Sequence, residues 1–270
     1  MNLTNKSEYV KKQYENDKNL AIRGQLHAKY GTNKKQNWIE WLFEQYKFKN
    51  SYRILELGCG NGVQWENRIE KLPDDCTLIL SDFSDGMVNI VWEKYSKHKN
   101  MLVQRINIQD IPFPDNCFDA VIANHMLYHV PDISKGISEV RRILKPGCKF
   151  YSATNGTNGM NMYIRNAYKK VNPQSDDFPD TSTFSLQNGK DILSEYFQNI
   201  ERFDFEDSLA VTNTQDLIDW IKSLDKFSVF SEKIFNDLYD YFENIRQKEG
   251  AINIPKETGL FISEKNISNC

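Results

Sequence analysis

The sequence predicts an α/β protein built on a doubly wound, mostly parallel sheet. Three observations predict this fold. Short apolar segments alternate with helix-like segments between about residues 50 and 153. The first apolar segment, residues 52–57, runs directly into a turn that contains Gly58, Gly60 and Gly62. Acidic or polar residues also follow the later apolar segments, at the edge where parallel strands end and where ligands bind in such sheets.

The glycine-rich turn is the most specific of these features. Glycine permits positive φ, and it lets backbone approach a ligand closely because it has no Cβ. The turn differs from the dinucleotide-binding pattern G-x-G-x-x-G, since Val63 stands where the third glycine belongs. It also lacks the Lys-Ser or Lys-Thr pair of a phosphate-binding loop. Glu56, two residues before the first glycine, would repel a pyrophosphate but suits a cationic ligand.

Bulk composition limits the class of protein. The 270 residues suffice for one large domain, and the net charge of −3 argues against a general nucleic-acid binder. The five cysteines form no C-x-x-C pair, which predicts reduced thiols in a cytoplasmic protein without a metal site. The polar N-terminus and the lack of an 18-residue apolar run predict neither a secretory signal nor a membrane span.

Residues 1–48 are predicted to form a helical cap before the sheet. Within them Trp38, Trp41, Leu42 and Tyr46 recur at the spacing of one helix face. The sheet follows. We expect a helix over residues 63–72 after the glycine turn, then a strand over 77–81 that ends in Asp82 and a helix that begins near Ser84 or Asp85. The remaining expected strands are 102–106, 118–123 and 148–153, with a helix over 133–144.

The alternation breaks after residue 153. Residues 154–185 are polar and contain one short helical stretch, so they are predicted to be an inserted lid. A helix over 189–197 and a strand over 200–205 come next. A second insertion, 206–250, carries two helices, and the last strand is expected at 258–263. Aromatic residues of the insertions are candidate walls of a substrate pocket, with ordinary core packing as the alternative: Tyr163, Tyr168, Phe178, Phe184, Trp220, Phe227 and Phe230.

Together these motifs resemble the class I S-adenosylmethionine-dependent methyltransferases, a Rossmann-like family, in their small-molecule, type 11-like form. Residues 56–62 resemble the family's E-x-G-x-G-x-G motif, and residues 110–113 resemble its loop after the third strand. Residues 124–132 resemble the segment after its fourth strand, and residues 141–147 resemble its helix-to-turn segment. The resemblance covers residues 50–153 and implies a seven-stranded sheet in a catalytic domain over residues 49–270.

The resemblance implies roles at the cofactor. Asp82 would accept both ribose hydroxyls, Asp110 would accept the adenine amino group, and Ile111 would donate its backbone N–H to the ring. Asn124 and His125 would lie near the sulfonium. The full set of cofactor-binding residues expected from the resemblance is Tyr30, Glu56, Gly58, Cys59, Gly60, Gly62, Asp82, Phe83, Ser84, Met87, Asn107, Asp110, Ile111, Asn124 and His125.

The implied reaction is methyl transfer from S-adenosyl-L-methionine to a small-molecule acceptor by in-line displacement, with S-adenosyl-L-homocysteine as product. Orientation and exclusion of water would drive it. His129, His125 and Tyr128 are candidates to take a proton. Two alternatives stay open: a non-catalytic S-adenosylmethionine-binding regulator, and an NAD(P)-dependent oxidoreductase. We expect no metal, no nucleic acid and no membrane partner, and a monomer or homodimer. The sequence does not identify the acceptor.

Overall fold

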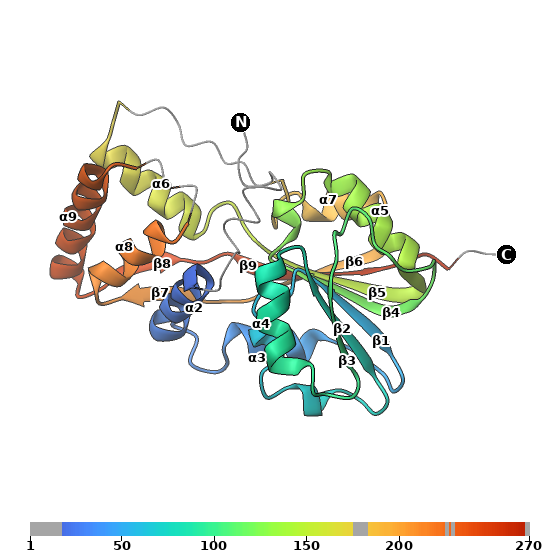
Figure 1. Cartoon of the computed structure of the whole chain (residues 1–270). Coiled ribbons are helices and arrows are strands. Elements are labelled where there is room, and N and C mark those ends of the chain that lie inside the picture. Colours follow the sequence, from blue (N-terminus) through green and yellow to red (C-terminus); the bar gives the residue numbers. More distant parts are fainter. Residues whose placement is uncertain (1–17, 175–182, 225–226, 228–229, 268–270) are drawn as a thin grey trace.

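The computed structural model of the chain describes residues 18–174, 183–224, 227 and 230–267. Two bodies are visible in Figure 1: a sheet with its flanking helices, and a smaller, mainly helical body beside it. Only the part of the predicted cap that begins at residue 18 falls within the described chain.

The sheet has seven strands in the order β3-β2-β1-β4-β5-β9-β6, and β9 runs antiparallel to both of its neighbours. The chain order reverses between β1 and β4, so the strand ends there form the usual ligand-binding crevice of such sheets. The predicted fold class is confirmed. The strands are β1 (Arg53–Leu57), β2 (Thr77–Asp82), β3 (Met101–Arg105), β4 (Phe118–Asn124), β5 (Leu144–Asn155), β6 (Gln198–Asp204) and β9 (Thr258–Glu264).

Helices cover both faces of this sheet. Leu42 and Val91 pack into the core on one face, whereas Ile137 and Leu193 pack into the core on the other. Three of these helices begin at a capping side chain, which accepts one of the first backbone N–H groups that lack partners within the helix. For α4 this cap is Ser84, one of the two starts that the sequence predicted. The helices are α3 (Trp38–Gln45), α4 (Asp85–Tyr95), α5 (Ile133–Ile143) and α7 (Gly189–Ser194).

The helix predicted over residues 63–72 is wrong. The structure has two short 3-10 turns instead, Val63–Trp65 and Ile69–Lys71. Asn67 adopts a positive φ of 58° between them, which an α-helix does not tolerate. The indole of Trp65 is fully buried and donates a hydrogen bond to Glu56. Tertiary packing of this tryptophan therefore overrides the helical pattern.

The smaller body combines the N-terminal helix with the two predicted insertions. Its core contains Leu26, Ile164, Leu217 and Leu238 from four different helices. A two-stranded antiparallel sheet, which the sequence pattern did not reveal, completes it. Each of these strands has only four residues, too few to show a clear alternation. Its elements are α2 (Lys18–Tyr30), α6 (Met160–Val171), β7 (Ser208–Val211), α8 (Thr214–Lys222), α9 (Glu232–Glu249) and β8 (Ile252–Pro255).

The aromatic residues of the insertions pack into cores and do not line the large cavity described below. Tyr168 stacks on Phe230 with 4.5 Å between ring centroids, for example. Phe184 belongs to the core under the sheet, and Phe178 lies outside the described residues. Their proposed role as pocket walls is therefore wrong for the described ones, and the alternative of core packing holds. Among the helices described, none has the length and apolarity needed to cross a membrane.

Candidate functional site

A cavity of about 990 Å³ lies where the carboxyl ends of the central strands face the smaller body. We divide its lining into two parts. The strand-end half comprises the ends of β1, β2 and β4 with the loops that follow them, together with the loop after β3. The α2 half comprises one face of α2, residues 31–40, and Phe205, Asp207 and Lys256. A smaller hollow of about 270 Å³ around Pro73 and Met101 lies at the opposite end of β2 and β3 and contains none of the predicted site residues.

The glycine turn forms the base of the strand-end half. Gly58, Gly60 and Gly62 all have positive φ, at 68°, 56° and 72°. A Cβ on Gly58 would stand 2.7 Å from Cβ of Met126. The N–H of Cys59 donates to the carbonyl of Ser81 at 2.8 Å, which ties the turn to β2. Gly58, Cys59 and Gly60 line the cavity, so the turn exposes backbone to a ligand as predicted.

Asp82 lies beside this turn at the end of β2. Its Oδ2 accepts the N–H of Gly60 at 3.0 Å, and its Oδ1 accepts the N–H of Ser84 at 2.9 Å. Burial raises the pKa of this carboxyl. Each carboxylate oxygen can accept more than one hydrogen bond, so Asp82 retains capacity for two ligand hydroxyls.

Glu56 is buried in the wall of the same half. The indole N–H of Trp65 donates to its carboxylate. Burial, with a smaller contribution from the charge of Asp82, raises the pKa of Glu56 to about 7. A cation placed beside this carboxyl would favour its ionised form. The structure therefore supports the expectation of a positively charged ligand here.

Asn124 lines the cavity, and its side chain has an unsatisfied acceptor. Its amide nitrogen donates to the Tyr46 hydroxyl and to Oε1 of Gln64, both at 2.8 Å. Its Oδ1 is buried without a hydrogen-bond partner among the described residues. Buried polar atoms are normally paired, so this oxygen is suited to a donor on a ligand. Gln64 also lines the cavity, and sequence reasoning missed both it and Tyr46.

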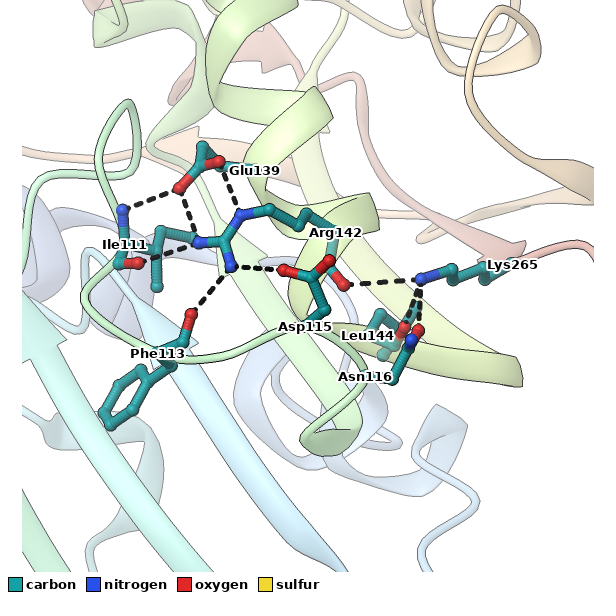
Figure 2. Close-up of polar contacts among 8 residues, drawn as sticks. All are labelled: Ile111, Phe113, Asp115, Asn116, Glu139, Arg142, Leu144 and Lys265. Atoms are coloured by element: carbon teal, nitrogen blue, oxygen red, sulfur yellow. Dashed lines mark hydrogen bonds and ion pairs between the residues drawn. The ribbon is translucent and has the colours of Figure 1, made fainter.

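The predicted adenine contacts at Asp110 and Ile111 need correction. The N–H of Ile111 donates to Glu139 at 2.9 Å, and its carbonyl accepts from Arg142 at 2.9 Å (Figure 2). This N–H is therefore not available to a ligand, and the side chain is buried in the core. Neither residue lines the cavity. The preceding residues of the loop, Asn107, Ile108 and Gln109, line it instead.

Hydrogen bonds from Arg142 and Lys265 fix the conformation of the loop around Ile111. Figure 2 shows the Arg142 guanidinium between Glu139, Asp115 and the carbonyls of Ile111 and Phe113. Lys265 in turn donates to the carbonyl of Leu144 at 2.7 Å. The resemblance places Arg142 in the family's helix-to-turn segment, and these contacts give it a structural role there.

Four other predicted cofactor residues differ in position. Phe83 lines the cavity, but Ser84 caps α4 and Met87 is fully buried in the protein interior. The predicted cofactor contact of Tyr30 is also wrong, because this residue is buried in the smaller body and its hydroxyl donates to Asp216 at 2.6 Å. Gly62 contributes to the turn through its carbonyl, which accepts from Tyr95, and does not line the cavity.

The three candidate proton acceptors all line the cavity after β4. The N–H of His125 donates to the carbonyl of Ala153 at 2.8 Å. Burial, assisted by the charge of Lys256, lowers the pKa of His125 to about 4, so this histidine is neutral at pH 7. The rings of Tyr128 and His129 meet edge to face, 4.6 Å apart.

The α2 half contains a buried ion pair that the sequence did not reveal. Lys256 and Asp207 have side-chain exposures of only 9% and 6%. Oδ1 of Asp207 also accepts the N–H groups of Thr32 and Asn33, each at 3.0 Å. Burial, with a contribution from Lys256, lowers the pKa of nearby His27 to about 3. The partners are 49 residues apart in sequence, so no local pattern could have identified them.

Comparison with known proteins identifies part of the chain as similar to methyltransferases. Residues 55–152 match the model of a family described as a methyltransferase domain. The chain contains a methyltransferase domain. Demethylmenaquinone methyltransferase of Symbiobacterium thermophilum is 32% identical over 119 residues, which cover 42% of this chain and 47% of the relative. Sterol 24-C-methyltransferase of Gibberella zeae is 31% identical over 108 residues, which cover 40% of this chain and 28% of that protein. This chain spans about half the length of the first relatives, or less.

Solved structures extend the likeness in fold to most of the chain. A methyltransferase structure from Bacillus halodurans has a TM-score of 0.59 at 14% identity and covers 85% of this chain and 99% of its own. The cyclase SpnF has a TM-score of 0.61 at 14% identity and covers 97% of both chains. An N-methyltransferase of Haemonchus contortus, solved with S-adenosylhomocysteine, has a TM-score of 0.55 at 18% identity and covers 86% of this chain and 53% of its own. These structures confirm the Rossmann-like class I fold.

Class I methyltransferases use S-adenosylmethionine, and the strand-end half fits this cofactor. Glu56 offers a buried carboxyl for its positive charge, and Asp82 offers acceptors for its ribose hydroxyls. The unpaired Oδ1 of Asn124 offers an acceptor for its ammonium group. The backbone of Gly58, Cys59 and Gly60 lines the cavity, where the methionine part of the cofactor could contact it.

Proposed function

We propose that this protein transfers the methyl group of S-adenosylmethionine to a small-molecule acceptor. The observation that carries the proposal is that one cavity joins the strand-end half to the α2 half. The first half fits the cofactor, and the second provides space for an acceptor beside it. The relatives named for demethylmenaquinone and sterol methylation also act on small molecules, which supports this acceptor class.

Bound S-adenosylmethionine would supply a methyl group already activated by the sulfonium. The task of the protein is then to align the acceptor and to exclude water, and orientation of this kind can contribute roughly 7–11 kcal/mol. Asp82 and Asn124 would fix the two ends of the cofactor, while Glu56 would balance its charge. His125, His129 and Tyr128 remain the proposed candidates to receive a proton at the acceptor.

We also propose that α2 and the residues up to 48 act as the cap over the cavity. The insertions at 154–185 and 206–250 would then hold α2 in place, since α2 packs against α8 and β7. The cytoplasmic location and the monomeric or homodimeric state stay part of this proposal.

Calorimetric titration of the purified chain with S-adenosylmethionine and S-adenosylhomocysteine tests the proposed function. We expect binding in the micromolar range, weakened about 100-fold in Asp82→Asn. Asp85→Asn is the matched control, because Asp85 is 73% exposed and pairs with Arg105 outside the cavity. Absence of binding at millimolar ligand to folded protein would refute the proposal. Binding without turnover of any acceptor would favour the regulatory alternative.

A further inference from the structure

The two halves of the cavity are lined by side chains of opposite net charge. Among the described residues, the strand-end half has three acidic side chains and one basic one: Glu56, Glu66 and Asp82, with Arg68. The α2 half has four basic side chains and two acidic ones: Arg23, Lys34, Lys35 and Lys256, with Glu40 and Asp207. The acidic half suits the positively charged cofactor. The basic half is suited to an acceptor that carries a negative charge.

The exposed charges of the α2 half have little influence on a ligand inside it. Glu40 has no ion-pair partner within the described chain, but it is exposed, and its carboxylate accepts the N–H of Asn37 at 3.1 Å. Lys34 and Lys35 are exposed as well. Charges in contact with water are strongly screened. The charge that a buried ligand meets is therefore set mainly by the buried ion pair of this half.

Lys256 is the cation of that pair. Its side chain is 9% exposed, and that of Asp207 is 6% exposed. The carboxylate of Asp207 is shared among three donors, because it accepts from Nζ of Lys256 and from the N–H groups of Thr32 and Asn33. An ammonium group has three N–H donors. Among the described residues Nζ donates to Asp207 alone, which leaves two donors for a ligand.

The ammonium group of Lys256 lies where the two halves of the cavity meet. Nζ is 5.9 Å from the centre of the Phe205 ring, and both residues line the cavity. After burial, the charge of Lys256 is the main cause that lowers the pKa of His27 on α2 and of His125 after β4. Asp207 opposes this effect at His27, but more weakly. The ion pair therefore gives this part of the cavity a net positive potential.

Aromatic rings form the wall beside this group. Trp38 lies 5.3 Å from the ring of His125 and 5.5 Å from that of Phe205, and all three residues line the cavity. Such surfaces favour a planar ligand, because aromatic rings make offset or edge-to-face contacts with other rings. One buried cation, already shared with a carboxylate, suits a monoanion better than a dianion, since each buried charge needs its own partner.

We propose that the α2 half binds an acceptor with a carboxylate on a planar ring, and that this carboxylate accepts hydrogen bonds from Nζ of Lys256 while the ring packs against Trp38 and Phe205. This inference rests on the proposed function. Hydrogen bonds between ionised groups are the strong ones, so Lys256 selects the acceptor and sets its position. It takes no part in the transfer of the methyl group.

Calorimetry on the chain saturated with S-adenosylhomocysteine tests this proposal. The ligands are 2-naphthoate and 2-naphthamide, which have nearly the same shape but differ in charge. S-adenosylhomocysteine lacks the sulfonium charge, so the comparison reports on the charge of the protein. We expect 2-naphthoate to bind roughly tenfold more tightly than 2-naphthamide, or better, which is the range for hydrogen bonds to charged groups. The cation 2-naphthylmethylammonium should bind more weakly than either.

Removal of both charges of the ion pair shows whether Lys256 causes this preference. The double variant Asp207→Asn with Lys256→Met leaves neither partner of the pair as an unpaired charge, and the asparagine oxygen can still accept backbone N–H groups. Its preference for 2-naphthoate over 2-naphthamide should disappear, while its binding of S-adenosylhomocysteine stays unchanged. Lys256→Arg keeps a cation and should keep the preference. Lys233→Met is the control, because Lys233 lies on α9 with 83% exposure and outside the cavity.

The ratio of the two affinities separates recognition from a structural role. A variant that only distorts the cavity would weaken both ligands alike and leave the ratio unchanged. Three results would overturn the inference: no binding of 2-naphthoate at millimolar concentration, equal or tighter binding of 2-naphthamide or of the cation, or an unchanged ratio in the double variant. The first two need no variant, so they apply even if the double variant does not fold. Failure of the unaltered chain to bind S-adenosylhomocysteine would instead refute the proposed function.

Discussion

The two halves of the cavity are built in different ways. The strand-end half comes from short segments that directly follow β1, β2 and β4, so its geometry is set by the register of one sheet. The α2 half is assembled from residues 20–40, 205–207 and 256, which only tertiary packing brings together. Their titrating groups also differ: burial raises the pKa of the carboxyls Glu56 and Asp82 in the first half and lowers the pKa of His27 in the second. A cavity of this kind can keep a fixed donor site while its acceptor site varies.

Lys256→Met should have the largest effect and should show that the α2 half depends on its ion pair. It leaves Asp207 buried and without its cation, which typically costs about 3–5 kcal/mol. Urea denaturation measures this loss. The control is Lys233→Met, whose pair with Asp237 is exposed and should change stability by less than about 0.5 kcal/mol. Equal effects of the two substitutions would show that burial of the ion pair between Lys256 and Asp207 does not determine its contribution to stability.

Glu56→Gln should separate stability from cofactor binding in the strand-end half. The folded pKa of Glu56, about 7, lies above its ordinary value of 4.5. The unfolded chain therefore loses its proton first, and the wild-type protein loses stability as the pH rises from about 4.5 to 7. Glutamine removes this effect and can still accept from Trp65. At about 1.4 kcal/mol per pH unit, the variant should be more stable than wild type by about 2–3 kcal/mol at pH 8 and equal to it at pH 4.

The same substitution removes the negative charge that balances the cofactor. Affinity for S-adenosylmethionine should fall about 30-fold, which corresponds to about 2 kcal/mol. Denaturation at both pH values and calorimetry give the two readouts. A variant that is less stable than wild type at pH 8 would show that the ionised carboxylate of Glu56 does not destabilise the free protein, which would contradict the effect of burial described above.

Gly58→Ala should destabilise the protein by about 2 kcal/mol. Its φ of 68° strains an L-residue, and the new Cβ would press on Met126 at 2.7 Å. Thermal unfolding measures the change. Unaltered stability together with unaltered cofactor binding would mean that the turn does not need the conformation described above.

Gly24→Ala is the corresponding glycine substitution in the α2 half, and it should have the smallest effect on stability. This glycine sits inside α2, and a Cβ there meets no atom within 4 Å. Alanine favours the helix over glycine by about 0.5–1 kcal/mol, so the variant should be more stable by that amount. The same unfolding assay applies. A loss of stability would show that α2 is not helical at this point.

Sequence predicts the strand-end half well because its information is local. Glu56, Asp82 and Asn124 each lie in the last two residues of a strand whose apolar pattern is readable, so their convergence at one edge follows from parallel pairing. The short strands β7 and β8 and the partners of Asp207 lacked any such local signal. Their positions depend on how the insertions fold against α2.

Two errors show where a motif alone misleads. Ile111 follows the family pattern, yet its N–H is taken by Glu139, 28 residues later, so the cavity contacts shift to Ile108 and Gln109. Tyr30 lies next to a cavity residue, Gly31, but one step along a helix turns its side chain toward Asp216. Both outcomes depend on side-chain partners that are remote in sequence.

A crystal structure with S-adenosylhomocysteine would show which half of the cavity holds the cofactor. We expect the ribose at Asp82, the adenine between Phe83 and Ile108, and the homocysteine amino group near Oδ1 of Asn124, with the space beside His27 left for an acceptor. Density for the adenosine in the α2 half, beside His27 and Lys256, would contradict the assignment of the two halves.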